Sequence, residues 1–356
     1  MTAQITVLAG DYIGPEIMAA GLKVLAAVSE GQNFDYQLHE MPFGGAGIDQ
    51  AGDPLPAEAL QTAQKSDAIL LAAIGGPKWD GAPKTPEQGL LAIRKALNLF
   101  ANIRPTEISP AMQKYSPIKN TEPVDFVIVR ELTSGIYFGQ PRETTSEYAL
   151  DTMRYTNQEI ERITRVAFDM AMKRRKHVTL VDKANVLDTS KLWRKIVAQI
   201  ATEYPAVTYD TSYVDAASMK IIASPSQFDV ILTENLFGDI LSDEAAQITG
   251  SLGTIPSMSR GSNGPSLYEP IHGSAPDIAG QGIANPISMV KSVAMMLTHS
   301  FDRADLAKQI SDAVDATVES GVVTPDLGGN ATTDEMTSAI INHIKESRHS
   351  YEPDHV

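Results

Sequence analysis

Residues 230–243 of this 356-residue chain read Val-Ile-Leu-Thr-Glu-Asn-Leu-Phe-Gly-Asp-Ile-Leu-Ser-Asp. The first four residues form a β-rich run, and the segment that follows mixes apolar residues with Asp239 and Asp243. Their spacing of four places both aspartates on one face of a helix. A short apolar strand that leads directly into a helix is the repeating unit of α/β folds, so this stretch indicates that fold class.

Strand and helix patterns alternate in the same way along the rest of the chain. Further β-rich runs occupy residues 5–8, 68–74, 126–129 and 178–181. Amphipathic patterns predict helices over residues 15–28, 86–99, 157–173, 286–297, 304–318 and 333–345. Thr156-Asn-Gln-Glu159 has the pattern of a reciprocal capping box at a helix start. Residues 251–282 are rich in Gly, Ser and Pro and predict extended loops, and no linker separates domains by composition.

The composition excludes several classes of protein. Hydrophobic residues make up 43% and charged residues 21%, which is ordinary for a globular protein. The formal net charge of −15 argues against a nucleic-acid partner. The chain contains no cysteine, so disulfides, thiolate metal sites and cysteine nucleophiles are excluded. It has no basic amino-terminal signal and no apolar run long enough for a bilayer, so we expect a cytoplasmic protein without a membrane partner.

Three standard motifs are absent from the sequence. There is no G-x-G-x-x-G after a strand, no G-x-x-x-x-G-K-[ST] and no H-E-x-x-H. Any dinucleotide is therefore expected to bind without the glycine turn of a Rossmann fold.

The acidic pair Asp239 and Asp243, with Asp215 upstream, is a candidate metal site. Two carboxylates on one helix face repel each other unless a cation lies between them. Oxygen-only ligation suits Mg²⁺ or Mn²⁺. A solvated acidic face is the alternative for an arbitrary pair, but the large apolar residues around this one favour a partly buried helix and a metal.

Three arginines, Arg94, Arg104 and Arg130, are candidates for binding an anionic substrate. Arg104 and Arg130 lie at the ends of apolar elements, where a guanidinium can bind a carboxylate with two parallel hydrogen bonds. For any one of them, solvation at the surface is the alternative. Arg94 shares a helix face with Glu87, Leu90 and Leu91, and this face taken alone is typical of a core stripe.

Residues 267–278 form a turn-rich stretch with His272 and Asp277. Such a stretch could bind phosphates through backbone amides, and Asp277 could accept the hydroxyls of a ribose. A structural hydrogen bond is the alternative role for His272. From the residues alone, we infer a metal-dependent enzyme that acts on an anionic small molecule.

Seven motifs, taken in order, resemble the decarboxylating dehydrogenases that act on 3-isopropylmalate, isocitrate, homoisocitrate and tartrate or malate. They lie at residues 10–16, 100–105, 129–132, 135–139, 181–186, 233–243 and 272–278. The resemblance covers residues 5 to about 340. The pair Leu90-Leu91 and the run Ala101-Asn102-Ile103 resemble the branch of the family that acts on 3-isopropylmalate.

This resemblance implies two discontinuous α/β domains around a shared twisted sheet, not a Rossmann fold. Residues 1–99 with 252–356 would form the dinucleotide-binding domain. Residues 100–251 would form the domain for substrate, metal and dimerisation. The implied reaction is the NAD-dependent oxidative decarboxylation of 3-isopropylmalate to 2-oxo-4-methylpentanoate in leucine biosynthesis. A sister activity on D-malate or tartrate, or a non-catalytic paralogue, is the alternative.

The resemblance also assigns roles to residues in a homodimer with shared active sites. Mg²⁺ or Mn²⁺ would be held by Asp239, Asp243 and the partner's Asp215, and would stabilise the alkoxide and the enolate. Lys183 from the partner would be the base and Tyr137 the acid. The remaining substrate-binding residues would be Leu90, Leu91, Arg94, Arg104, Arg130 and Val186, of which Leu90, Leu91 and Val186 would surround the isopropyl group.

The same resemblance implies a site for NAD. Its residues would be Glu87, His272, Gly273, Ser274, Ala275, Pro276, Asp277, Ile278 and Asn285. Asp277 followed by Ile278 matches the form of the family that uses NAD rather than NADP. This chain departs from the family pattern at Ala9 and Tyr12, where proline and glycine are usual, and glycine often permits a φ that other residues resist.

Overall fold

The computed structural model describes residues 2–119 and 122–349. The chain divides into two compact units, and both are discontinuous in sequence. Unit 1 comprises Met1–Leu97, Ser109–Tyr115 and Gly250–Val356. Unit 2 comprises Asn98–Ile108 and Ser116–Thr249. The separate roles expected for a dinucleotide domain and a substrate domain stay predictions.

Unit 1 has five strands in the order β2-β1-β3-β12-β11. Four of them are parallel: β2 (Tyr36–Glu40), β1 (Ala3–Gly10), β3 (Ala68–Ala73) and β12 (Ser266–Pro270). The fifth, β11 (Pro256–Arg260), is antiparallel to β12. All six residues of β3 are apolar and buried, which is typical of a central parallel strand with helices on both faces.

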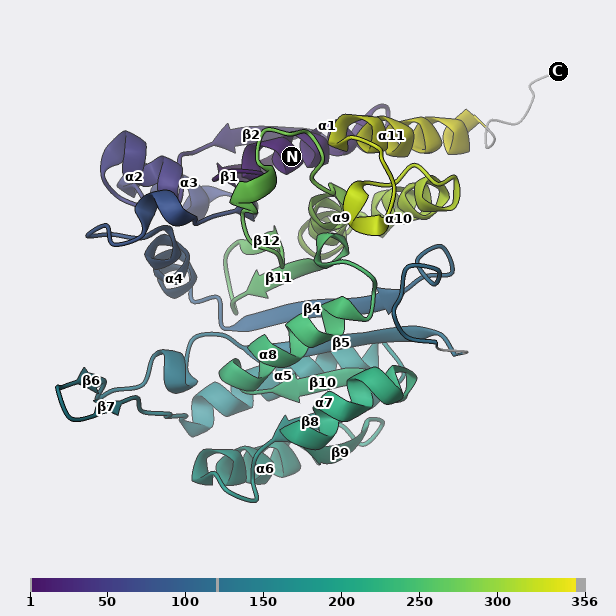
Figure 1. Ribbon diagram of the computed structural model, residues 1–356. Coiled ribbons are helices and arrows are strands. Elements are labelled where there is room, and N and C mark those ends of the chain that lie inside the picture. The colour runs from purple at the N-terminus through teal and green to yellow at the C-terminus, as the bar shows by residue number, and fades with distance from the viewer. Residues whose placement is uncertain (1, 120–121, 350–356) are drawn as a thin grey trace. The chain divides into compact units, whose positions relative to one another are not determined.

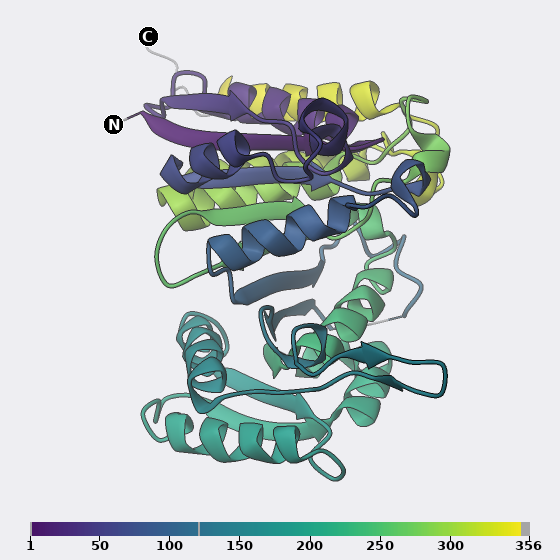
Figure 2. The same cartoon turned by 90° about the vertical axis from the view of Figure 1, so that its left-hand side faces the viewer.

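Helices cover the unit 1 strands. One group contains α1 (Gly14–Ser29), α9 (Ile287–Phe301), α10 (Ala304–Glu319) and α11 (Thr333–His349), which pack against one another. Figure 2 shows α2 (Gly45–Ala51), α3 (Ala57–Lys65) and α4 (Pro86–Ala96) in front of the strands, with α10 and α11 behind them. Four 3₁₀ turns complete the described part of unit 1: η1 (Pro77–Trp79), η4 (Leu252–Thr254), η5 (Pro276–Ile278) and η6 (Pro325–Leu327).

Unit 2 repeats this plan with its own five strands, in the order β4-β5-β10-β8-β9. The parallel set is β5 (Val124–Glu131), β10 (Val230–Thr233), β8 (His177–Asp182) and β9 (Thr208–Tyr213), and β4 (Ala101–Ile108) is antiparallel to β5. One face is covered by α5 (Asn157–Met172) and α6 (Asp188–Ala201), and the other by α7 (Val214–Ala223) and α8 (Asn235–Gln247) (Figure 1). The remaining elements are η2 (Gly135–Tyr137), η3 (Pro225–Gln227) and a projecting hairpin of β6 (Glu143–Thr144) and β7 (Ala149–Leu150).

The register of unit 2 brings three polar strand ends together. Arg130 on β5 pairs with Thr233 on β10, and Thr233 pairs with Val181 on β8. The chain continues from these positions into Glu131, Glu234 and Asp182. Because parallel strands end at one edge of a sheet, side chains from three distant parts of the sequence meet there.

The α/β class and the five predicted strands are confirmed, but the prediction of extended loops over residues 251–282 is wrong in part. This segment contains β11 and β12, whose side chains are largely buried, including Met258, Leu267 and Tyr268. The turn-forming residues concentrate at 261–265, Gly-Ser-Asn-Gly-Pro, between the two strands. Short strands depend on pairing with their neighbours, which local composition does not record. No helix in the ranges that the structure describes is long and apolar enough to cross a membrane.

The predicted capping box at the start of α5 is confirmed. The Thr156 hydroxyl accepts a hydrogen bond from the Glu159 amide at 3.3 Å, and the Glu159 carboxylate accepts one from the Thr156 amide at 2.7 Å. Replacing Thr156 by alanine should lower the free energy of unfolding by about 1 kcal/mol, because a helix-end amide loses its partner. Thr156→Ser, which keeps the hydroxyl, should unfold close to wild type. Urea titration followed by circular dichroism measures both, and equal stability of the alanine and serine variants would contradict the assignment.

Candidate active site

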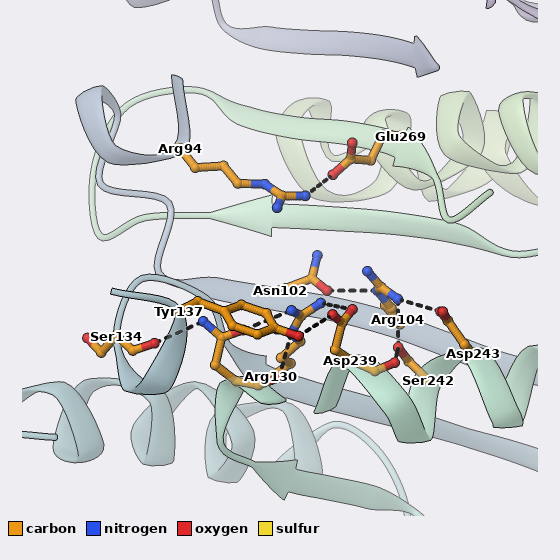
Figure 3. A network of polar contacts seen from close by, with 11 residues as sticks. Arg94, Asn102, Arg104, Arg130, Ser134, Tyr137, Asp239, Ser242, Asp243 and Glu269 are labelled. Atoms are coloured by element: carbon orange, nitrogen blue, oxygen red, sulfur yellow. Dashed lines mark hydrogen bonds and ion pairs between the residues drawn. The ribbon is translucent and has the colours of Figure 1, made fainter. Parts of the chain in front are cut away.

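Arg130 is the central side chain of the polar cluster in unit 2. It lies at the end of β5 and is only 3% exposed. Its Nη2 donates to the Asn235 side-chain oxygen at 2.8 Å and its Nη1 to Asp239 at 2.7 Å. Its Nε donates to the Asn235 backbone oxygen at 3.0 Å. The guanidinium is thus bound by the first two turns of α8 (Figure 3).

The glycine in the opening motif makes this contact possible. A Cβ on Gly238 would lie 2.5 Å from Cγ of Arg130 and 2.8 Å from its Cβ. Both distances are shorter than side-chain atoms tolerate, so α8 can approach the arginine this closely only at a glycine.

Arg104 binds the next part of the same helix from the antiparallel strand β4. Its Nη1 donates to Ser242 at 2.6 Å and to Asp243 at 3.2 Å. Its Nε donates to the Asn102 side-chain oxygen at 2.9 Å (Figure 3). Each of the two predicted metal aspartates is therefore paired with one of the predicted substrate arginines.

Tyr137 extends the cluster from the 3₁₀ turn η2. Its hydroxyl donates to the second oxygen of Asp239 at 2.8 Å. Burial and then this bond to Asp239 raise the pKa of Tyr137 to about 12. The phenol therefore keeps its proton at neutral pH, as the predicted acid must.

The aspartate pair has the donor chemistry of a site for Mg²⁺ or Mn²⁺. Burial and the proximity of Asp239 raise the pKa of Asp243, against the opposing effect of Arg104. Two adjacent carboxylates in a partly buried position would gain from a divalent cation. In the described part of the chain, no group of three His, Cys, Asp or Glu side chains is arranged to hold a metal ion.

Lys183 and Asp215 form a second, separate pair in unit 2. Lys183 Nζ lies 2.6 Å from Asp215, which lowers the pKa of that carboxyl. Neither residue makes a hydrogen bond or an ion pair with Asp239 or Asp243 within the described ranges. Val186, one turn beyond Lys183, is 63% exposed and donates its amide to the Lys183 carbonyl. Lys183 thus contacts Asp215 through its side chain and Val186 through its carbonyl. No hydrogen bond or ion pair in the described ranges joins these residues to the aspartate pair.

In unit 1, helix α4 does not bury its two leucines. The buried residues of α4 are Pro86, Gly89 and Ile93. Leu91 is 42% exposed, and Leu90 is half-buried. The interpretation of this face as a simple core stripe is therefore wrong for Leu91. An exposed leucine beside a half-buried one is suited to contact an apolar ligand.

Arg94, at the end of α4, is bound by Glu269 of β12. The two side chains are 2.8 Å apart and largely buried, and the figure shows them facing each other (Figure 3). Arg94 Nε is buried and has no hydrogen-bond partner among the described residues. The guanidinium therefore has one buried N–H group that no described residue satisfies.

The loop from His272 to Ile278 is fixed to the strand ends of unit 1. Ser274 donates its hydroxyl to the Gly75 carbonyl at 2.8 Å, and its own carbonyl accepts from the Ile13 amide at 3.1 Å. Ala275 adopts a left-handed conformation (φ 42°), after which Pro276, Asp277 and Ile278 form η5. A Cβ on Gly273 would meet nothing within 4 Å, so space lies beside the loop.

Two polar residues of the predicted NAD site differ in their hydrogen bonding. His272 Nε2 is shielded from solvent and has no partner in the described part of the chain, and burial lowers the His272 pKa. The ring is neutral at pH 7 and can pair with a polar group of a ligand. Asn285 accepts from the Ile287 amide and donates to Asp326. Asp277 and Glu87 are exposed.

Tyr12 does not point freely into solvent. Its φ is 51°, the left-handed region that favours glycine, and its ring packs edge-on against Trp79 at a centroid distance of 5.9 Å. A Cβ on Gly76 would lie 2.2 Å from the Tyr12 ring. The neighbouring Asp11 accepts backbone amides from Gly45, Ala46 and Gly75 at 2.8–2.9 Å and holds this turn in place.

Several residues that position the site were not identified from the sequence, although all lie inside or beside the motifs. The signal in the sequence that could have identified most of them is a polar side chain in an otherwise apolar strand or at the start of a helix. These residues are Asn102, Glu234, Asn235, Ser242 and Glu269.

Comparisons with known proteins bear on the whole chain. The model of the isocitrate/isopropylmalate dehydrogenase family matches residues 4–340. The 3-isopropylmalate dehydrogenase of Listeria innocua is 57% identical over 347 residues, 97% of this chain and 99% of that protein. The 3-isopropylmalate dehydrogenase of Streptococcus thermophilus is 59% identical over 346 residues, 97% of this chain and 100% of that protein. Isocitrate dehydrogenase from Methylococcus capsulatus has a similar structure, with a TM-score of 0.87, 37% identity and coverage of 97% and 100%.

The backbone at Tyr12 gives a test of strain beside the loop from His272 to Ile278. Tyr12→Gly and Tyr12→Ala both remove the ring, but only glycine adopts a φ of 51° without steric cost. The glycine variant should therefore be more stable than the alanine variant by about 1 kcal/mol. Thermal denaturation of the two proteins measures this difference. An alanine variant as stable as the glycine variant would show that the left-handed conformation is not maintained.

Proposed function

The chain belongs to the isocitrate/isopropylmalate dehydrogenase family, and we propose that it oxidatively decarboxylates 3-isopropylmalate to 2-oxo-4-methylpentanoate with NAD, in the cytoplasm, as a step of leucine biosynthesis. The observation that carries this choice is the identity of 55–59% to relatives named 3-isopropylmalate dehydrogenase. Those matches extend over 96–97% of the chain.

The arginines are proposed to bind the two carboxylates of the substrate. Arg104 and Arg130 in unit 2 and Arg94 in unit 1 each carry a guanidinium that is at least partly buried and already bound to a carboxylate side chain. Such a group can exchange one carboxylate for another without being exposed to water. A guanidinium that binds a substrate carboxylate helps to fix the substrate's orientation, which lowers the barrier of the reaction.

The leucines of α4 are proposed to select the isopropyl group. Leu90, Leu91 and Val186 offer apolar surface that is exposed or half-buried. Isocitrate would place a third carboxylate against them, and burying an unpaired charge in apolar surroundings is costly. D-malate and tartrate lack the alkyl group and would lose its contacts.

Lys183 and Tyr137 are proposed to move the protons. Lys183 would act in the partner's site as the neutral amine, which takes the proton of the substrate's hydroxyl. Its ion pair with Asp215 would then have to open, as it would if that carboxylate bound the metal. Tyr137 stays protonated at neutral pH because its pKa is about 12, so it would donate a proton to carbon 3 after carbon dioxide has left. Asp239 accepts the Tyr137 hydroxyl and holds the phenol in position.

Asp239 and Asp243, with the partner's Asp215, would hold Mg²⁺ or Mn²⁺, which supplies Lewis-acid stabilisation of charge on the substrate's oxygens. Asp239 and Asp243 lie one turn apart on α8 and present only oxygen donors. The exposed carboxylate of Asp215, with a pKa lowered by Lys183, is charged at neutral pH and available to a second chain.

NAD would bind unit 1 and accept the hydride. His272, the loop through Ile278, Asn285 and Glu87 would contact it. The exposed Asp277 would accept the hydroxyls of the adenosine ribose. A 2′-phosphate at this position would face a like charge, so NADP should bind more weakly.

A homodimer is proposed because unit 2 exposes apolar residues on α7 and α8. Met219 is 66% exposed, Ile222 50% and Ile240 59%. Exposed apolar side chains on packed helices mark an interface with another protein. A second copy of this face would bury these side chains in a twofold-symmetric contact.

The proposed reaction predicts NADH production from 3-isopropylmalate that a chelator abolishes and that added Mg²⁺ or Mn²⁺ restores. Absorbance at the nicotinamide band measures the rate, with D-malate, tartrate and isocitrate as alternative substrates and NADP as the alternative cofactor. Each lost alkyl contact should cost about 1–3 kcal/mol of transition-state binding free energy and lower kcat/KM accordingly. Malate should therefore react weakly and isocitrate least. If isocitrate, D-malate or tartrate were the best substrate, the proposed role of Leu90 and Leu91 would be wrong.

Shared active sites predict complementation between inactive variants. Lys183→Met and Asp243→Asn homodimers should each be nearly inactive. In a mixed dimer, one site combines intact aspartates with an intact lysine, and the other site carries both defects. Random reassortment makes half the dimers mixed, so about a quarter of wild-type activity should return. Mass spectrometry verifies subunit exchange, and verified exchange without recovery would refute the shared site.

A further inference from the structure

Glu234 is a buried carboxyl group that precedes the helix of the predicted metal ligands and is linked by hydrogen bonds through Ser190 to the predicted base, Lys183. It follows β10, precedes α8 and is 2% exposed. Its Oε1 accepts the hydroxyl of the fully buried Ser190 at 2.9 Å. The same Ser190 oxygen accepts the backbone amide of Lys183 at 3.1 Å.

Glu234 differs from the two other carboxyl groups at this sheet edge. Asp182 is bound by Arg194 through two bonds of 2.7 and 3.0 Å, and Glu131 accepts three donors from Thr133 and Ser134 and faces Arg162. Among the described residues, Glu234 has no cationic partner, and its Oε2 is buried without a hydrogen bond. A carboxyl group held in this way does not serve stability, because burying an unpaired oxygen costs free energy.

We infer that Glu234 is a positioning residue for Lys183, which it places through the Ser190 hydroxyl. Lys183 begins a turn in which its carbonyl accepts the amides of Val186 and Leu187. Its amide is the only other backbone group of Lys183, and Ser190 binds it. Glu234 orients the Ser190 hydroxyl and thereby leaves the serine oxygen free to accept this amide. The inference rests on the proposed role of Lys183 as the base.

Two substitutions separate this role from a structural one. Burial raises the pKa of Glu234 to about 7, so a neutral group of the same shape is a close substitute. Glu234→Gln keeps an oxygen that accepts from Ser190. Glu234→Leu removes it, and also removes the unpaired Oε2. The leucine variant should therefore melt no lower than wild type while its activity falls.

Steady-state kinetics give the first measurement. Displacing a catalytic group by about 1 Å can cost about 100-fold in rate, so kcat of Glu234→Leu should fall by about that factor. KM for 3-isopropylmalate should change by less than about threefold, because Lys183 does not bind the carboxylates. Glu234→Gln should stay close to wild type. Ser190→Ala should reproduce the loss, and the Glu234→Leu/Ser190→Ala double variant should be no worse than either single one.

Subunit mixing then shows through which residue Glu234 acts. Because Lys183 serves the partner's site, Glu234→Leu should behave like a lysine defect. Mixed with Asp243→Asn it should recover about a quarter of wild-type activity, and mixed with Lys183→Met it should recover nothing. If Glu234→Leu recovered activity with Lys183→Met but not with Asp243→Asn, Glu234 would act on helix α8 of its own chain. That result would overturn the inference. If the control mixture of Lys183→Met and Asp243→Asn recovers activity, recovery of Glu234→Leu with neither partner would also overturn the inference. A leucine variant as active as wild type would overturn it as well.

A second measurement depends neither on enzyme activity nor on whether the active sites are shared between subunits. The extent to which acetic anhydride acetylates Lys183 can be quantified by peptide mass spectrometry. It should differ from wild type in Glu234→Leu and Ser190→Ala but not in Glu234→Gln. The Lys183→Met and Asp243→Asn mixture serves as the control for the shared site. If that control fails while the labelling changes as expected, the shared site is wrong and the link from Glu234 to Lys183 stands. Unchanged labelling in Glu234→Leu would refute the link.

Discussion

The polar cluster of unit 2 depends on one buried cation. Arg130 is fixed by the side chain and backbone of Asn235 and by Asp239, so a strand end and a helix start share one guanidinium. Gly238 lets the helix approach it. A buried arginine without these acceptors would be very costly, which ties the position of α8 to the charge on β5. The positions of Asp239, Tyr137 and, one turn later, Asp243 follow from that constraint.

The two units share a plan but hold different chemistry. Each has four parallel strands and one antiparallel strand in the described part of the chain. Unit 2 places charged side chains at its strand ends, whereas unit 1 places a backbone loop there, held by Ser274 and by the carboxylate of Asp11. The first arrangement suits a compact, highly charged ligand, and the second suits a long ligand bound through main-chain groups.

The sequence predicted the elements whose cause is local. Buried strands such as β3 appear as short apolar runs, and the start of α5 appears as a capping box, because both depend on neighbouring residues. The strands β11 and β12 were missed because their pairing lies outside any local window. Glu234 stood inside a motif and Glu269 shortly before one, both without an assigned role. Their importance depends on which strands end side by side, and the contact partner of Glu269, Arg94, is 175 residues away.

The pairing of Arg130 with Asp239 and of Arg104 with Asp243 makes the ligand-free cluster nearly neutral. A cation on the aspartates would compete with the arginines, and an anion on the arginines would compete with the aspartates. When both ligands bind, each compensates the charge that the other leaves unpaired. By thermodynamic linkage, the factor by which the cation tightens the anion equals the factor by which the anion tightens the cation. A cation and an anion bound at these ion pairs would therefore be mutual effectors without any second conformation of the protein.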